Sequence, residues 1–375
     1  MNEFSLKPKF FFGHGAIKAL AELPIMKAYI ICDPFMVESG LIDEVTGALN
    51  ERAADYKIFS RVVPNPTIEV VSEGFAEISL FQPDTVIAFG GGSAMDSAKS
   101  IRKVYAESMK VPQPCLVAIP TTSGSGSEMT SVAVISDSKN NQKIPLLDDS
   151  LLADIAILDS MFTLGVPKVV TADAGMDVMT HCLEAYVATG ANDFTDACAE
   201  KSMQIVWNYL VKTYNTGENV YARERMHNAS SLAGIAFNAA GLGLCHGMAH
   251  AMGAFFHVAH GRLNAIILPH IIRYNARCAS AQENYTLNRY ARAAELLGLT
   301  GLNSTEKTIA LIDGIRSMMH EMNMPETVTA AGIDRNDFLD RIPDMVERAL
   351  ADDCTSTNPR TPARKEVEEI YRSLL

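Results

Sequence analysis

The amino-acid sequence predicts an α/β domain built on a parallel sheet, followed by an all-helical domain. In the first part of the chain, short and continuously apolar runs alternate with segments whose apolar residues recur at helical spacing. Such alternation is typical of a parallel sheet, whose strands are apolar throughout because helices cover both faces. From about residue 163 onward, long helical patterns follow one another with few strand-like runs. The 375 residues suffice for two cores, and we predict domains at 1–162 and 163–375.

Each predicted strand of the first domain ends before a proline, glycine or aspartate, the residues that favour turns. These strands are predicted at 28–32, 56–63, 84–89 and 115–119, and the helices of the same domain at 41–50, 68–81 and 94–104. The helices of the second domain are predicted at 172–187, 195–214, 221–239, 279–297, 304–322 and 363–375.

The composition excludes several classes of partner. The formal net charge is −12 with no basic run, which argues against nucleic acid because its binding needs clustered positive charge. No uninterrupted apolar run approaches the length of a membrane span, so we expect no membrane association. The seven cysteines include no CxxC pair, and the first residues lack a secretory signal. Both observations predict a reducing, cytoplasmic location.

Three polar features follow predicted strands and are candidates for ligand binding. Gly90-Gly91-Gly92-Ser93 separates a strand from a helix, so it suits a pyrophosphate, although a plain tight turn is the alternative. The stretch 121–128, TTSGSGSE, offers hydroxyl and backbone donors, with a flexible surface loop as its alternative. Asp33 could accept hydrogen bonds from a ribose diol or simply form the turn before Pro34. The shared position after strands favours ligand binding.

Two further stretches have the composition of a metal site. Asp177 and His181 are four residues apart, so they share one face of a helix whose other residues are mostly apolar. The stretch 241–269 holds four of the nine histidines among apolar and small residues: His246, His250, His257 and His260. Burying several imidazoles is costly without partners, and imidazole is the commonest metal ligand. One carboxylate and three imidazoles would suit Fe(II), Zn(II), Ni(II) or Mn(II). Spacing alone leaves open which histidines bind the metal.

Together these motifs resemble one known family, the iron-dependent (group III) alcohol dehydrogenases. The runs that carry the resemblance are GGGSAMDSAK, PTTSGSGSE, GMDVMTHCLEAY, GLCHGMAHAMGAFFHVAHG and STNPR, which occur in family order over nearly the whole chain. Within the family, VISD, HNASSLAG, NDFTDACAEK and RIPDMVERALADD are similar to the propanol dehydrogenases of bacterial propanediol-utilisation operons. The resemblance implies a dehydroquinate synthase-like architecture, in which the α/β domain binds NAD and the helical domain binds the metal.

The resemblance also implies roles for particular residues. It implies the metal ligands Asp177, His181, His246 and His260. Fe(II) is the expected metal, with Zn(II) or another divalent ion as the alternative. His250 would lie beside the nicotinamide and substrate as a proton relay, whereas His257 matches no residue with a role.

The residues that correspond to NAD contacts in the family are Asp33, Gly91, Gly92, Ser93, Thr121, Thr122, Ser125 and Lys143. Family members with aspartate at the position of Asp33 use NAD(H) rather than NADP(H). Ser125 stands where many members have threonine and keeps the hydroxyl group.

The implied reaction is reversible hydride transfer between NAD(H) and a short-chain alcohol or aldehyde, first of all 1-propanol and propionaldehyde. The metal would act as a Lewis acid in a homodimeric enzyme. The likeness to propanediol-utilisation enzymes adds an aldehyde dehydrogenase or the shell proteins of a bacterial microcompartment as partners. It also adds the interior of that compartment as an alternative location to the free cytoplasm.

Three other functions are weighed against this reaction. A polyol dehydrogenase of the same fold, acting on 1,3-propanediol, lactaldehyde or glycerol, is the nearest alternative. A dehydroquinate-synthase-like cyclase is disfavoured, because the stretch 241–269 offers only Arg262 to a phosphorylated substrate. A non-catalytic structural component of a larger assembly would be expected to have damaged metal or cofactor motifs, and here the motifs are intact.

Overall fold

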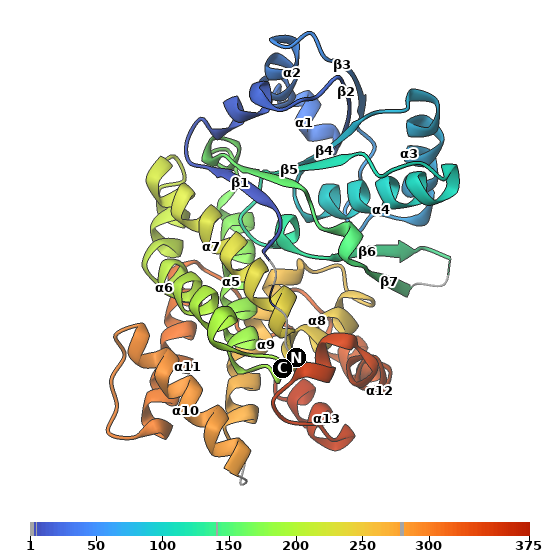
Figure 1. The fold of residues 1–375 in the computed structure, drawn as a ribbon. Helices are drawn as coiled ribbons and strands as arrows, with labels where there is room; N and C mark the ends of the chain where they lie inside the picture. The colour runs from blue at the N-terminus through green and yellow to red at the C-terminus, as the bar shows by residue number, and fades with distance from the viewer. Residues whose placement is uncertain (1–3, 5, 140–141, 278–280) are drawn as a thin grey trace. The chain divides into compact units, whose positions relative to one another are not determined.

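The computed structural model describes residue 4 and residues 6–139, 142–277 and 281–375, and it divides into two compact units (Figure 1). We call residues 1–166 with 218–234 the sheet unit, and residues 167–217 with 235–375 the helical unit. The first contains a parallel sheet and the second is built from helices, which confirms the predicted fold class. The domain limits at residues 162 and 163 stay a prediction from the sequence.

The sheet unit is organised by a six-stranded parallel sheet with the strand order β1-β8-β5-β4-β2-β3. Its strands are β1 (Lys9–Phe12), β2 (Lys27–Cys32), β3 (Asp55–Phe59), β4 (Thr85–Gly90), β5 (Cys115–Pro120) and β8 (Ile155–Leu158). From β2 the chain moves outward to β3 and then returns to β4 on the other side of β2. The strand order therefore reverses between β2 and β4, and open α/β sheets bind ligands at the carboxyl ends of strands at such a point.

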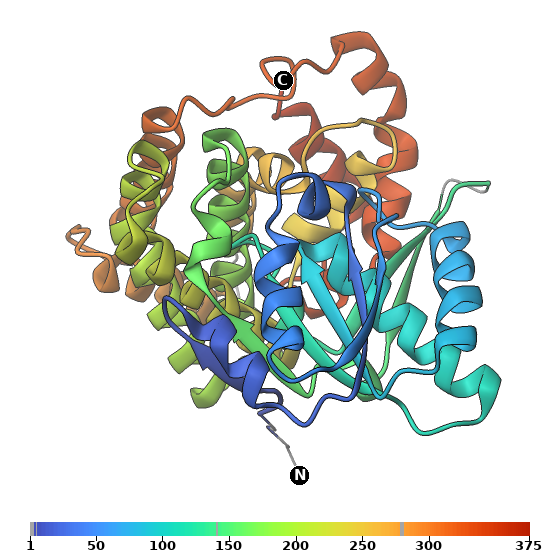
Figure 2. The ribbon, with the colours of Figure 1, turned by 90° about the horizontal axis from the view of Figure 1, so that it is seen from above.

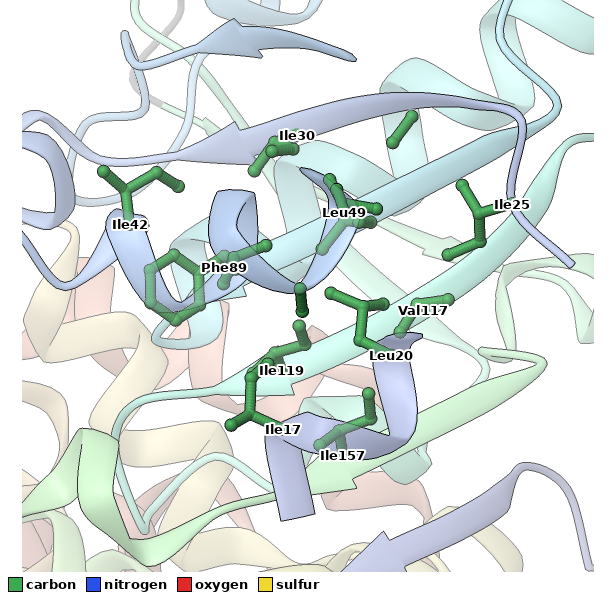
Figure 3. Packing of buried hydrophobic residues seen from close by; sticks show 14 of the residues in the cluster. Ile17, Leu20, Ile25, Ile30, Ile42, Leu49, Phe89, Val117, Ile119 and Ile157 are labelled. Atoms are coloured by element: carbon green, nitrogen blue, oxygen red, sulfur yellow. The ribbon is translucent and has the colours of Figure 1, made fainter. Parts of the chain in front are cut away.

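Alternate residues of the central strands enter two separate hydrophobic cores. Ile30 and Phe89 belong to the core on one face of the sheet (Figure 3), whereas Tyr29 and Val86 belong to the core on the other. The first face is covered by η1 (Ala16–Glu22), α1 (Pro34–Glu38) and α2 (Ile42–Asn50), and the second by α3 (Ile68–Phe81) and α4 (Gly92–Met109) (Figure 2). Because both faces are covered, the central strands β4 and β5 are almost entirely buried and apolar, as the sequence indicated, whereas the edge strands β1 and β3 contain charged residues.

Several elements of the structure were not predicted from the sequence. The strands β1 and β8 have four residues each, too few for a clear apolar run. The strands β6 (Val132–Asp137) and β7 (Gln142–Leu147) form a separate antiparallel hairpin, in which β6 buries Ala133 and Ile135 while the described side chains of β7 are mostly exposed. The helix α12 (Arg335–Ala351) contains Pro343, which interrupts the helical pattern.

The helical unit consists of eight further helices and the end of a ninth among the described residues. The eight are α5 (Lys168–Val187), α6 (Asp193–Asn215), α8 (Leu244–Gly253), α9 (His260–Ala276), α10 (Ala281–Leu296), α11 (Ser304–Glu321), α12 and α13 (Arg364–Arg372). The ninth, α7 (Val220–Ala240), begins within the 218–234 segment of the sheet unit. Among the described residues no single helix is long and apolar enough to cross a membrane. Taken together, α7 and α8 have the length and apolar composition of a span, but the chain bends by 104° between them.

A close backbone approach in the helical unit joins α5 to the start of α9. A Cβ atom added to Gly261 would lie 2.1 Å from the backbone oxygen of Asp173 and 3.1 Å from Cβ of Asp177. Arg262 reinforces this contact, since its Nε and Nη2 atoms each donate to the Asp173 carboxylate at 3.0 Å. The absence of a side chain at Gly261 thus sets the separation of two helices that carry predicted metal ligands.

We predict that Gly261→Ala destabilises the protein by about 1–3 kcal/mol, because the added methyl group must push backbone away from backbone. The control is Gly47→Ala in the exposed part of α2, where an added Cβ meets nothing within 4 Å. There alanine should stabilise by up to about 1 kcal/mol, because it favours the helix over glycine. Urea unfolding of both variants measures the difference, and equal stabilities would contradict the packing argument.

Candidate active site

The predicted cofactor residues of the sheet unit gather where the strand order reverses. The register pairs Cys32 with Phe89 and Phe89 with Ile119, so the residues that follow β2, β4 and β5 leave the sheet side by side. Asp33 follows β2 directly, and a Cβ atom added to Gly90 would lie 3.3 Å from its Oδ2 atom. Gly90 has a φ of +148°, a conformation that side chains rarely adopt. The strand end therefore lies directly against the Asp33 carboxylate.

The glycine turn also faces the hydroxyl-rich loop that follows β5. A Cβ atom added to Gly91 would lie 3.3 Å from Oγ1 of Thr122, and one added to Gly92 would lie 3.2 Å from Oγ of Ser125. The backbone N–H of Thr121 donates to the carbonyl oxygen of Gly90 at 3.0 Å. Hydroxyl groups and the first backbone N–H groups of α4 thus converge, which is the donor arrangement that suits a phosphate group.

The two remaining cofactor candidates, Ser93 and Lys143, lie in different parts of the sheet unit. Ser93 is the second residue of α4 and so lies within the turn just described. Lys143 lies instead on β7, opposite Ser136 in the hairpin, and its side chain is exposed. Its charge acts on Asp96, whose pKa is nevertheless raised by burial. The structure therefore gathers the other predicted cofactor residues at the sheet edge but leaves Lys143 on the separate hairpin.

A buried lysine that the sequence analysis did not single out fixes the continuation of the hydroxyl-rich loop. Nζ of Lys99 donates to the carbonyl oxygens of Ser127, Thr130 and Val132 at 2.6, 2.7 and 2.8 Å. Burial lowers the pKa of Lys99 to about 8, opposed by the charge of Asp96. Asp96 accepts from Oγ of Ser127 at 3.0 Å. The signal in the sequence was the pair Asp96 and Lys99, three residues apart on α4 and therefore on one face of it.

The predicted metal ligands converge in the interior of the helical unit. Asp177 and His181 on α5 and His246 on α8 are buried, and each offers one ligand atom within 4.8 Å of the others. His260 begins α9, and its Nε2 atom lies 3.6 Å from Oδ1 of Asp177. The His246 ring stacks on the ring of His181, with centroids 4.6 Å apart. One carboxylate and three imidazoles from three helices are thus brought together.

The amide of Asn264, a fully buried residue of α9, shows where the lone pairs of these groups point. Its Nδ2 atom donates to Oδ1 of Asp177 at 2.7 Å and lies 3.2 Å from Nε2 of His246 and 3.0 Å from Nε2 of His260. An amide nitrogen has only two hydrogens, so it cannot donate to the carboxylate oxygen and both imidazole nitrogens at once. Converging acceptors in excess of donors fit a cation. The donor set also fits Fe(II), since imidazole and carboxylate ligands are common to it.

A second residue missed by the sequence analysis, Glu184, holds His246. Its Oε2 atom lies 2.5 Å from Nδ1 of His246, and its Oε1 atom accepts from the backbone N–H of Cys245 at 2.7 Å. Because Nε2 of His246 faces a donor, the ring hydrogen belongs on Nδ1, which donates to Glu184. A carboxylate behind an imidazole commonly orients metal-binding histidines. Glu184 stands three residues after His181 on α5, and that spacing was the available signal.

The ionisation of these buried groups follows from their surroundings. Burial, and then the neighbouring imidazoles of His181, His260 and His250, lower the pKa of His246 well below its usual value. His246 is therefore neutral, the form in which imidazole binds a metal. Burial raises the pKa of Glu184 to about 8, although backbone N–H groups of α8 act in the opposite direction.

The other two histidines of the 241–269 stretch have separate surroundings. The His250 ring is parallel to the His260 ring within 16°, with centroids 5.2 Å apart, and its Nδ1 atom lies 3.0 Å from Oδ2 of Asp352. His257 lies in the connection between α8 and α9 with an exposed side chain. His250 therefore adjoins the ligand group, and it has a carboxylate partner of its own.

Comparison with known proteins identifies the class of enzyme. Residues 7–160 match the family model for iron-containing alcohol dehydrogenase, and residues 171–375 match the C-terminal model of the Fe-containing alcohol dehydrogenase family. The chain therefore belongs to the iron-containing alcohol dehydrogenases, a family of enzymes that interconvert alcohols and aldehydes. Membership in an enzyme family disfavours the purely structural alternative.

Individual relatives narrow the comparison. The chain is 43% identical to the 1-propanol dehydrogenase PduQ of Citrobacter freundii and 44% identical to that of Salmonella typhimurium, over 100% of both chains in each case. Among solved structures, a 1,3-propanediol oxidoreductase is 31% identical with a TM-score of 0.93, and the match covers 100% of both chains.

We predict that Glu184→Gln lowers the affinity for divalent metal by about 10- to 100-fold, the usual effect of losing such a partner. Glutamine has one acceptor oxygen, so it cannot accept from both His246 and Cys245. Metal content after competition with a graded chelator measures the effect, with no need for the activity of the loaded enzyme. The matched control is Glu200→Gln, because Glu200 accepts from the hydroxyl group of Tyr186 instead. Equal metal retention in both variants would contradict the assignment.

Proposed function

We propose that this chain catalyses reversible hydride transfer between NAD(H) and a short-chain aldehyde, with propionaldehyde and 1-propanol as the first substrates. The observation that carries the proposal is the buried carboxylate–imidazole donor set, in a chain 43–44% identical from end to end to two 1-propanol dehydrogenases. Apolar side chains near the histidines, such as Met252 and Phe256, are buried and suit a short aliphatic substrate.

We assign the metal to Asp177, His181, His246 and His260, with Fe(II) expected and Zn(II) or another divalent ion as the alternative. Bound there, the metal would supply Lewis acidity toward a carbonyl oxygen, and NAD(H) would supply the hydride. The helices contribute position: α5, α8 and α9 hold the ligand atoms together, and Glu184 keeps Nε2 of His246 unprotonated. Preorganised ligands of this kind need no rearrangement when charge develops during the reaction.

The carboxyl edge of the sheet is assigned to NAD. Backbone N–H groups at Gly91, Gly92 and Ser93 would hold the pyrophosphate, together with the hydroxyl groups of Thr121, Thr122 and Ser125. Asp33 would accept from the ribose diol and repel a 2′-phosphate. Lys143 is kept as a candidate for the ribose contact, a role that rests on the family resemblance.

His250 is proposed as the group that moves the proton during the reaction. Its Nδ1 atom is engaged with Asp352, so the proton would enter and leave at Nε2. Imidazole is suited to this exchange because its two ring nitrogens can each accept and donate a proton.

A second candidate function is polyol oxidation, favoured by the likeness in fold and sequence to a 1,3-propanediol oxidoreductase. Selectivity between such substrates depends on about 1–3 kcal/mol per methylene group.

We further propose that the chain forms a homodimer, and that an aldehyde dehydrogenase or microcompartment shell proteins are its partners. A location within a bacterial microcompartment, or free in the cytoplasm, follows from the same resemblance to propanediol-utilisation enzymes.

The metal role and the substrate are tested together. We expect a strong chelator to abolish the oxidation of NADH by propionaldehyde, and anaerobic addition of Fe(II) to restore it. Undiminished activity in protein shown to be free of metal would contradict the assignment. A series of C2 to C4 aldehydes, diols and glycerol, compared by kcat/KM, then ranks the substrates. A higher value for 1,3-propanediol than for 1-propanol would favour the polyol function.

We predict that Asp33→Ser shifts cofactor preference toward NADPH by roughly tenfold, because removing one negative charge relieves its repulsion of the 2′-phosphate. The ratio of kcat/KM for NADPH and NADH measures the shift. The control is Asp55→Ser, which removes the same charge at the amino end of β3, away from the carboxyl edge. If Asp33→Ser leaves the ratio unchanged, Asp33 does not select the cofactor.

A further inference from the structure

A carboxylate to which no role has yet been assigned lies behind His250. Asp352 follows the last residue of α12 and precedes the short helix η5 (Asp353–Thr357). Its Oδ2 atom lies 3.0 Å from Nδ1 of His250, although 102 residues separate the two in the sequence. The side chains are 29% and 21% exposed for His250 and Asp352, so the contact is shielded from solvent on most sides.

The Asp352 carboxylate is held in place by its own end of the chain. Its Oδ1 atom accepts from the backbone N–H of Cys354 at 2.9 Å, which is the N-cap bond of η5. With one oxygen fixed by the backbone, the other is directed at His250. The N-cap bond therefore orients the Asp352 carboxylate toward His250.

This contact decides which nitrogen of His250 has the hydrogen. Burial raises the pKa of Asp352, but the hydrogen bond and charge of His250, with the N–H of Cys354, outweigh it and lower the pKa overall. The carboxylate is ionised and can only accept, so Nδ1 of His250 must be the donor. In the neutral ring the lone pair then belongs to Nε2, which is the atom left to exchange a proton.

The same contact fixes the orientation of the His250 ring. The ring is parallel to that of His260 and lies edge-on to that of His246, with centroids 6.0 Å apart and an interplanar angle of 70°. A ring held at Nδ1 cannot rotate by half a turn without losing its hydrogen bond. Both the tautomer and the direction of Nε2 thus depend on Asp352.

We propose that Asp352 is the positioning residue of this enzyme's proton relay, holding His250 as the Nδ1–H tautomer with Nε2 available for the reaction. The inference rests on the proposed function of His250. In aldehyde reduction, the proton leaves Nε2–H for the product oxygen, the ring keeps its hydrogen on Nδ1, and solvent returns the proton to Nε2. The carboxylate stays ionised throughout, as in other carboxylate–imidazole pairs.

The decisive variant is Asp352→Asn, which keeps Oδ1 as the acceptor for Cys354 and replaces Oδ2 with an amide that can only donate. The amide favours the opposite tautomer, with the hydrogen on Nε2. We expect kcat to fall by roughly 10- to 100-fold, because proton transfer by a positioned side chain usually accelerates a reaction by at least this factor. The KM values for aldehyde and NADH, the metal content and the melting temperature should change little. A fall in metal content or melting temperature that accounts for the lost turnover would overturn the proposal.

The matched control is Asp353→Asn, which removes the same charge one residue later, where the side chain is exposed. It should leave kcat unchanged. An equal loss of kcat in both variants would show an effect of net charge and would overturn the positioning role.

A double-mutant comparison separates this inference from the proposed function. His250→Ala should lower kcat at unchanged metal content, and adding Asp352→Asn to it should have no further effect, because Asp352 acts through His250. If His250→Ala leaves kcat unchanged, the relay function itself is wrong. If His250→Ala lowers kcat but Asp352→Asn does not, only the positioning role is wrong. If the two losses multiply in the double variant, Asp352 acts elsewhere and the inference is overturned.

Discussion

The helical unit depends on one carboxylate and two imidazoles that are buried at a single point, with the half-buried imidazole of His260 beside them. Asp177, His181 and His246 are each less than a tenth exposed, and polar groups in such surroundings are costly unless other polar groups or a cation satisfy them. The surrounding helices meet this demand with Asn264 on one side and Glu184 on the other. The requirement for these partners explains why Asn264 and Glu184 are themselves fully or nearly fully buried.

Glu184 also links the proposed metal site to the packing of α8. Gly243 precedes this helix and has no side chain to cap it, and a Cβ atom there would lie 2.7 Å from Oε1 of Glu184. The first N–H groups of α8 instead bond to Glu184 and to Asn358 of the STNPR motif. A carboxylate at a helix N-terminus is favoured by the helix dipole. One side chain therefore caps the helix and orients the histidine that the helix carries.

The sheet unit is subject to a different constraint. The loops at the carboxyl edge of its sheet must leave backbone N–H groups available to a ligand and still keep a fixed conformation. The reversal of strand order between β2 and β4 opens that edge, and glycines allow the turn to approach the hydroxyl-rich loop closely. Lys99 and Asp96 of α4 then form hydrogen bonds with Thr130 and Ser127, at the end of the hydroxyl-rich loop and just after it. Buried polar groups that are fully paired in this way rigidify the loop, and a rigid loop holds its donors in position for an anion.

The sequence by itself determined the fold class, because apolar strands alternating with helices admit few arrangements other than a parallel sheet. It also predicted residue types for the proposed metal site, since Asp177 and His181 share a helix face by spacing alone. Only the tertiary structure decided that Asn264 and Glu184 complete that centre and that Asp352 holds His250. Those contacts join residues 18, 62 and 102 positions apart, and local spacing carries no information about such separations. The short strands β1 and β8 and the β6–β7 hairpin were missed for a related reason: their pairing, rather than a long apolar run, defines them.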